Sequence, residues 1–172
     1  KRLADIIDFL PDATFAIDSH GVVIAWNRAM ERMTGVAKAD MLGKGDYEYA
    51  LPFYRERRPI LINLVLEENP AFAARYPFIR KEGNTLFSEI IIPHFNNGRG
   101  AALWFTASRL YDRNGAVAGA IESIREITER KQAEEALNES ERRVRELADL
   151  LPQGIYEAGT DGRMPYDNRL AL

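Results

Sequence analysis

A short series of residues near the N-terminus of this chain recurs near its C-terminus. Leu10-Pro11 returns as Leu151-Pro152, and Asn27-Arg28 returns as Asn168-Arg169, at one constant offset. An aromatic residue and a glycine between these pairs recur at matching positions. Self-similarity at a fixed offset marks a tandem array of one structural unit. The repeat therefore predicts one complete domain, a connector and, in residues 152–172, the truncated start of a second domain.

The amino-acid composition excludes several kinds of functional site. The 172 residues include no cysteine, so disulfides, thiolate metal sites and cysteine nucleophiles are excluded. A net charge of −3 gives no reason to expect nucleic acid. The apolar run 60–66 contains Asn63 and is far shorter than the roughly 20 residues of a membrane helix. We expect a fragment that makes no membrane contact and acts in the cytoplasm, although its parent chain can carry a membrane anchor elsewhere.

The N-terminal third has the pattern of a helix followed by a hairpin. Residues 1–10 place apolar side chains at helical spacing, and Pro11 ends this flanking helix. Residues 14–18 and 22–26 are β-rich runs, and Gly21 between them indicates a tight reversal. We expect two neighbouring antiparallel strands here.

Two further helices are predicted before the remaining strands. Asn27 caps a helix over 28–34, which Gly35 stops. Pro59 is well placed as the first residue of a longer helix, 59–68, whose apolar face is Ile60, Leu61, Leu64 and Val65.

Three long strands follow, each after a turn that contains glycine. They are predicted over 85–94, 100–111 and 116–128. With the first two strands they make a five-stranded antiparallel sheet with helices on one face, which is an α+β domain over residues 11–128.

Residues 126–151 have a different composition, because they are rich in Glu, Arg and Lys and contain no Gly or Pro. This pattern predicts a long charged linker helix. Small or apolar residues recur in two heptad series four positions apart, which favours a helix pair. A single solvated helix between two domains is the alternative. The predicted dimer seam consists of Ala133, Leu137, Ser140, Val144, Leu147 and Leu151.

Together these features resemble a PAS domain, the sensory module of multi-domain signalling proteins. The resemblance covers residues 3–131. At its end, Glu126-Ile127-Thr128 resembles the Asp-Ile-Thr exit motif of the family, with Glu126 in place of the usual Asp. The other residues that carry it are Leu10-Pro11-Asp12-Ala13, Gly21, Trp26-Asn27-Arg28 and Asp112-Arg113-Asn114-Gly115.

The resemblance implies a sensory and relay module whose parent is a two-component histidine kinase. Glu126, Ile127 and Thr128 would relay a change in the sheet to the linker helices of a homodimer. The plainer alternative is that Glu126 and Thr128 only cap a helix. The competing function is a ligand-free module that dimerises and acts as a spacer.

A ligand pocket, by resemblance, would lie between the sheet and helix 59–68. An ordinary core would have the same apolar composition. The candidate walls are Phe15, Leu61, Leu64, Val65, Leu103, Phe105 and Ile124.

Glu122 is the most informative polar residue of the predicted pocket. Strand alternation places it on the face of Ala120 and Ile124. If that face is internal, the carboxylate needs a partner, which Arg80, Arg109 or a ligand would supply. If the face is external, Glu122 pairs at the surface, and the pattern leaves both options open.

The cofactor is left unidentified. Haem-binding relatives take their axial histidine from the helix that corresponds to 59–68, and no histidine occurs there, which argues against haem; His94 stays a candidate ligand. Missing cysteine argues against covalent flavin photochemistry. No metal-binding or catalytic constellation is recognisable, so we expect an unidentified small molecule and no enzyme activity in this fragment.

Overall fold

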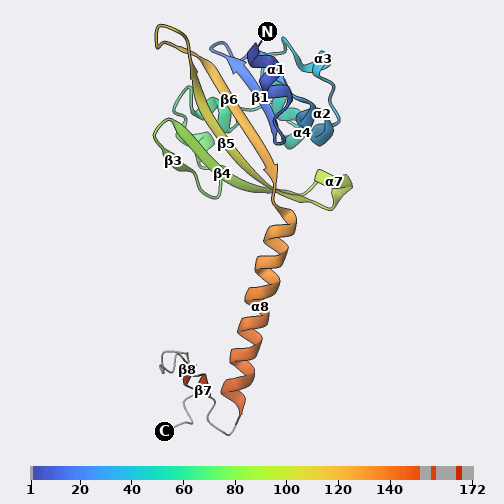
Figure 1. Ribbon diagram of the computed structural model, residues 1–172, viewed down its shortest axis with the longest axis vertical. Helices are drawn as coiled ribbons and strands as arrows, with labels where there is room; N and C mark the ends of the chain where they lie inside the picture. The colour runs from blue at the N-terminus through green and yellow to red at the C-terminus, as the bar shows by residue number, and fades with distance from the viewer. Residues whose placement is uncertain (1, 152–155, 158–165, 168–172) are drawn as a thin grey trace. The chain divides into compact units, whose positions relative to one another are not determined.

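A six-stranded antiparallel sheet is the framework of the chain in the computed structural model, which describes residues 2–151, 156–157 and 166–167 (Figure 1). The strand order is β2-β1-β6-β5-β4-β3, and every neighbouring pair is antiparallel. The strands are β1 (Ala13–Asp18), β2 (Val23–Trp26), β3 (Arg80–Glu82), β4 (Thr85–Ile92), β5 (Ala101–Tyr111) and β6 (Val117–Glu126).

The sixth strand is the difference from the predicted five. β3 is an exposed three-residue edge strand, and Arg80 pairs with Phe87 of β4. Gly83 has a φ of 56°, which allows the tight reversal between the two strands. Three residues are too few to show strand alternation, so the sequence pattern indicated only a turn at this point.

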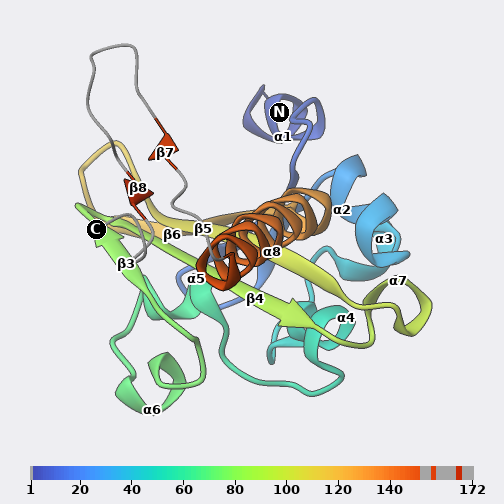
Figure 2. The ribbon, with the colours of Figure 1, turned by 90° about the horizontal axis from the view of Figure 1, so that it is seen from below.

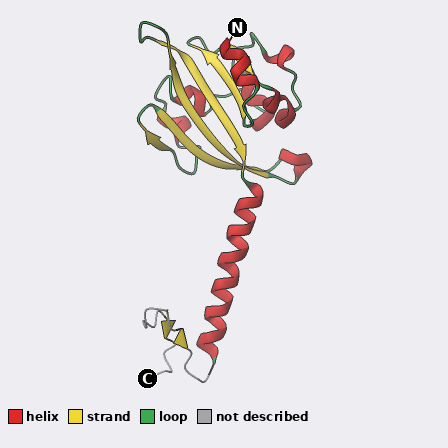
Figure 3. Cartoon of the chain, in the orientation of Figure 1, coloured by secondary structure: helices red, strands yellow, loops and turns green. Residues whose placement is uncertain are grey.

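Most helices lie between β2 and β4 in the chain and cover the inner face of the sheet (Figure 3). The flanking helix α1 (Arg2–Asp8) packs on the opposite face, where Ile7 contacts Ala16 and Ala25 (Figure 2). The remaining short helices are α2 (Arg28–Thr34), α3 (Lys38–Met41), η1 (Glu48–Ala50), α4 (Leu51–Tyr54), α5 (Leu61–Leu64), α6 (Pro70–Ala73) and α7 (Phe95–Gly98).

The predicted helix 59–68 is much shorter in the structure, where α5 is a single turn. Ile60 is extended, and its N–H donates to the side chain of Asn63 at 2.9 Å, so the helix begins only at Leu61. Asn69 is also extended because it caps α6. Asparagine side chains that bond to the local backbone compete with helix continuation, which explains the late start of α5 and the separate start of α6.

The core lies between the inner face and the short helices. Phe15 contacts Trp26 and Tyr49, and Phe53 stacks on Phe95 with ring centroids 5.6 Å apart. β1 and β6 approach closely at Gly119, where a Cβ atom would clash with the backbone of Ile17. The core is therefore built on a close β1–β6 contact that only glycine permits.

The long helix α8 runs over Thr128–Leu150, within the predicted linker 126–151. β6 ends at Glu126, two residues before the strand end that the pattern predicted. The chain divides into two compact units, Lys1–Thr128 and Glu129–Leu172. Ion pairs one helical turn apart, such as Glu139 with Arg143 at 2.9 Å, follow the surface of α8.

Most of the predicted second domain start, residues 152–172, lies outside the described residues. Tyr156–Glu157 and Tyr166–Asp167 are described as two short strands, β7 and β8, that pair antiparallel. Within the described parts of the chain, no helix has the length and apolar character needed to cross a membrane.

Candidate functional site

Asn27 connects four segments at the start of the domain. Its Oδ1 accepts hydrogen bonds from the N–H groups of Thr14, at 2.9 Å, and Met30, at 2.8 Å. Its Nδ2 donates to the carbonyls of Ile7, at 3.1 Å, and Asp12, at 2.9 Å. Asn27 therefore caps α2 and also fixes α1 and β1, which explains the Asn-Arg pair of the repeat in the first copy.

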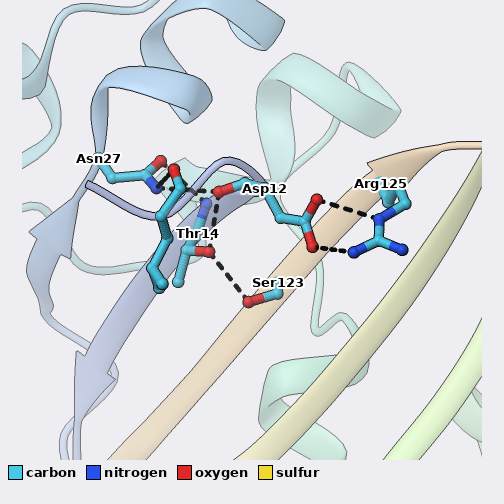
Figure 4. Close-up of polar contacts among 6 residues, drawn as sticks. Asp12, Thr14, Asn27, Ser123 and Arg125 are labelled. Atoms are coloured by element: carbon cyan, nitrogen blue, oxygen red, sulfur yellow. Dashed lines mark hydrogen bonds and ion pairs between the residues drawn. The ribbon is translucent and has the colours of Figure 1, made fainter. Parts of the chain in front are cut away.

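A polar clasp joins the start of β1 to the end of β6 (Figure 4). The Arg125 guanidinium binds the Asp12 carboxylate through two hydrogen bonds, at 3.0 and 2.6 Å. Thr14 Oγ1 donates to the Asp12 carbonyl, so the 2.9 Å contact with Ser123 uses the serine hydroxyl as donor. The clasp lies directly before the exit of the domain.

The exit segment is bound to β5 and to the loop before it. The Ile127 N–H donates to the Ala102 carbonyl at 2.8 Å, and Thr128 Oγ1 accepts from the Ala102 N–H at 3.1 Å. The same hydroxyl donates to Glu126 at 2.9 Å, and Glu126 also accepts from Asn96. Each of the three predicted relay residues therefore makes a hydrogen bond that ties the exit segment together or to the chain around it, and their role in relay stays a prediction.

Glu122 lies on the inner face of the sheet. It is opposite Phe15 in the β1–β6 register and opposite Ala107 in the β5–β6 register. The residue is 0% exposed, and within the described residues neither carboxylate oxygen has a hydrogen-bond partner. The internal alternative for its face is therefore correct.

The two arginines proposed as partners of Glu122 bind elsewhere. Arg109 Nε donates to the Val65 carbonyl. Arg80 forms an ion pair with Glu82 and stacks over Phe87 with its guanidinium carbon 4.8 Å from the ring centroid. That part of the prediction was wrong because Arg80 belongs to the edge strand β3, whose side chains are exposed.

Burial changes the protonation chemistry of this region. Desolvation raises the pKa of Glu122 to about 8, and the nearby backbone N–H of Ile62 lowers it in part. Desolvation also raises the pKa of Tyr49 to about 12 and raises the pKa of both Tyr54 and Tyr76; Glu122 adds to all three shifts. Burial therefore favours the neutral form of the Glu122 carboxyl and of the three tyrosines whose pKa it raises.

The predicted pocket walls come together, but as a packed core. Phe15, Leu61, Leu103 and Phe105 are at most 1% exposed and belong to one continuous cluster with the other predicted wall residues, Leu64, Val65 and Ile124. A small cavity of about 50 Å³ reaches Leu64, Val65 and Arg109 at the periphery. A ligand at Glu122 would thus require the core to rearrange.

Comparison with protein families identifies the fold. The family model described as PAS fold matches residues 7–132, which is most of the chain. The chain belongs to the PAS family.

Solved structures share the PAS architecture at low sequence identity. The PAS domain from Bordetella pertussis BvgS is 17% identical, with a TM-score of 0.51, over 82% of this chain and 96% of that one. An RNA-binding Light-Oxygen-Voltage receptor is 19% identical, with a TM-score of 0.53, over 80% of this chain and 36% of that one. The PAS domain of a Colwellia psychrerythraea protein is 20% identical, with a TM-score of 0.46, over 74% of this chain and 96% of that one.

A search of curated proteins found no significant match. The two solved relatives with TM-scores above 0.5 share this fold, and at 17% and 19% identity they show the fold alone.

The sequence pattern missed the polar residues of the helical layer. Asn63 Nδ2 donates to the Tyr49 hydroxyl at 2.8 Å, and Arg58 stacks over the Tyr54 ring, with 3.8 Å from the guanidinium carbon to the ring centroid. These residues lie in short helices or, for Arg58, in the segment between α4 and α5, so no periodicity indicates their inward orientation.

The two histidines of the PAS domain occupy different environments. His20 is exposed in the β1–β2 turn, and His94 is half-buried beside Phe95. No group of three metal-binding side chains occurs in the part of the chain that the structure describes. His94 could at most provide a single ligand to a bound group.

Proposed function

We propose that this PAS domain is the sensory and relay module of a signalling protein. The observation that carries the proposal is that β6 contains Glu122, a buried acid without a hydrogen-bond partner, and ends at Glu126, the first residue of the exit segment Glu126–Thr128. An event beneath the sheet at Glu122 therefore acts on the strand that leads into α8.

The proposed switch uses the protonation and partners of Glu122. A small ligand with a donor or a cationic group would favour the ionised carboxylate and shift the packing around Phe15 and β6. Movement of β6 would change the Arg125–Asp12 clasp and the Thr128–Ala102 bond, which together hold the exit. A ligand can shift such an equilibrium only by its different affinity for the two states.

The proposed output is a homodimer of linker helices. Leu137 is 61% exposed, Val144 63% and Leu147 58% in the single chain, so an apolar seam is free to pair with a second α8. We infer that the parent is a cytoplasmic sensor histidine kinase, because PAS modules often precede kinase domains; enzyme activity, nucleic acid and membrane contact form no part of the proposal for this module.

A ligand-free dimerisation and spacer module is the second candidate. The observation that favours it is the packed core, in which the predicted pocket walls are almost fully buried. In this case Glu122 would stay a neutral core acid, and the exit segment would only fix the orientation of β6 at the start of α8.

One experiment separates the two candidates. The purified protein is denatured, the released small molecules are analysed by mass spectrometry, and the absorption spectrum of the native sample is recorded. A compound released in stoichiometric amount by wild type and lost in Glu122→Gln supports the sensor. A wild-type protein that releases nothing, and whose Glu122→Gln variant signals normally in the parent chain, supports the spacer.

A further inference from the structure

A surface cavity of about 480 Å³ lies between the segment that follows α4 and the end of β4. Phe53, Ile90 and Ile92 line part of its wall. This volume is in the range of small-molecule sites, which are mainly apolar with a few well-placed polar groups. The cavity is separate from Glu122, which is not among its lining residues.

Unpartnered polar atoms concentrate at this cavity. Three of its lining residues, Tyr54, Arg58 and His94, have a buried side-chain atom without a hydrogen-bond partner among the described residues: the Tyr54 hydroxyl, Arg58 Nε and His94 Nε2. The hydroxyl of Tyr76, a residue only 6% exposed, is the fourth such atom. Tyr76 and Arg58 both lower the pKa of Tyr54, so both lie near its hydroxyl, but neither contact has hydrogen-bond geometry.

Four of the seven unpartnered buried atoms in the described residues thus belong to one small region. Buried donors and acceptors nearly always have a partner, because an unsatisfied group costs free energy. A bound ligand would supply the partners that these atoms lack, after a small rotation of the side chains that cover them from the cavity.

The charge of the cavity selects the ligand class. Arg58 and Arg75 line it, and the Glu56 carboxylate lies 3.5 Å from Arg58 and 3.3 Å from Arg75. One carboxylate offsets one of the two guanidinium charges, so the group retains one net positive charge. That balance fits a monoanion, whereas a dianionic phosphate would be repelled by Glu56.

We propose that this cavity binds an organic monocarboxylate with an apolar body. The carboxylate would accept hydrogen bonds from Arg58 Nε and the Tyr54 hydroxyl, and the apolar body would lie against Phe53, Ile90 and Ile92. Guanidinium geometry matches a carboxylate, and stacking on Tyr54 already holds the Arg58 plane in place.

The test is calorimetric titration of the whole chain with sodium octanoate and, separately, with octanamide, its neutral analogue. We expect saturable octanoate binding and octanamide affinity lower by about tenfold or more, because the amide lacks the charge-assisted bonds. Absence of saturable octanoate binding at millimolar concentration, or equal affinity for the amide, would overturn the proposal.

Two variants and a matched control locate the site. Arg58→Gln should weaken octanoate binding by about tenfold or more, and Tyr54→Phe, which removes only the hydroxyl, should weaken it by a smaller factor. Arg57→Gln is the control, since Arg57 pairs with Asp46 and Glu48 outside the cavity. Unchanged affinity in Arg58→Gln, or an equal loss in Arg57→Gln, contradicts the assignment.

The proposal for this cavity and the proposal for the sensor site at Glu122 can be contradicted independently of each other. Glu122→Gln preserves a neutral side chain behind the cavity, so it should leave octanoate affinity unchanged within about threefold. Loss of octanoate binding in Glu122→Gln would contradict a separate site at Arg58, whereas the released-ligand experiment tests only the interior.

Discussion

At the scale of single residues, Glu122 shows what alternation can and cannot predict. The pattern correctly grouped Glu122 with Ala120 and Ile124, and all three are buried on the inner face. It left the choice of face open because both faces of β6 carry apolar residues. The register opposite Phe15 decides the question, and that register depends on residues more than a hundred positions away.

The raised pKa of Glu122 predicts a specific pH dependence of stability. Its pKa moves from an ordinary 4.5 to about 8 on folding, so between these values the folded state holds one proton that the unfolded state has lost. The free energy of unfolding should therefore fall as pH rises through this window, by about 1.4 kcal/mol per pH unit from this group. Glu122→Gln cannot ionise and should lack this component in urea unfolding from pH 5 to pH 8.

Glu89→Gln provides the matched control, because Glu89 lies on the outer face of β4, opposite Trp104 of β5. The free energy of unfolding of Glu89→Gln should change with pH as it does in wild type. Parallel stability curves for wild type and Glu122→Gln would show that the buried carboxyl does not titrate as described.

At the scale of elements, the predictions succeeded where the periodicity was long and failed where it was short. The strands that became β4, β5 and β6, the hairpin of β1 and β2, and the long helix α8 were all predicted within a few residues. The predicted helix 59–68 is divided in the structure: Asn63 bonds to the Ile60 N–H where α5 begins, and Asn69 caps the separate helix α6. Such side-chain bonds depend on local geometry that an apolar pattern does not contain.

Because β1 and β6 approach closely, a single methyl group added at Gly119 should lower the stability of the domain. Gly119→Ala places a Cβ against the carbonyl oxygen of Ile17, so the strands must separate. We expect a loss of about 1–3 kcal/mol in the free energy of unfolding, measured by chemical denaturation. Gly45→Ala is the control, because its Cβ would make only an ordinary 3.7 Å contact with Val22. Equal stability of the two variants would contradict the close strand approach.

The bond between the Thr128 hydroxyl and Ala102 of β5 allows a test of how the exit segment is held. Thr128→Val removes the hydroxyl that accepts from the Ala102 N–H and donates to Glu126. The free energy of unfolding should fall by about 1–3 kcal/mol, and the Ala102 amide should exchange with solvent faster. Thr128→Ser retains the hydroxyl and should restore slow exchange. Slow exchange in Thr128→Val would mean that the Ile127–Ala102 bond holds the exit alone.

At the scale of the whole molecule, the repeat and the heptads predict an organisation beyond one domain. The two-unit division places the boundary at Thr128–Glu129, next to the predicted exit motif. The pattern could predict a helix from composition alone. Whether two helices pair depends on a second chain, and in the described part of a single chain the exposed apolar residues of the proposed seam are consistent with pairing.

If two α8 helices pair, the protein is a dimer, and two charges placed in the seam should dissociate it. Leu137→Asp with Val144→Asp places carboxylates at neighbouring core positions of the seam, where burial without partners is strongly unfavourable. Light scattering should give twice the 19.5 kDa chain mass for wild type and the single chain mass for the double variant.

The control for the seam adds the same charge to the outer surface of the same helix. Gln132→Asp with Asn138→Asp changes two exposed positions outside the heptad series and should leave the dimer mass unchanged. A dimer that survives Leu137→Asp with Val144→Asp would place the contact elsewhere on the PAS domain. A wild-type protein that is monomeric over the whole concentration range would instead favour the single solvated helix, and relay through a helix pair would then be excluded for this chain.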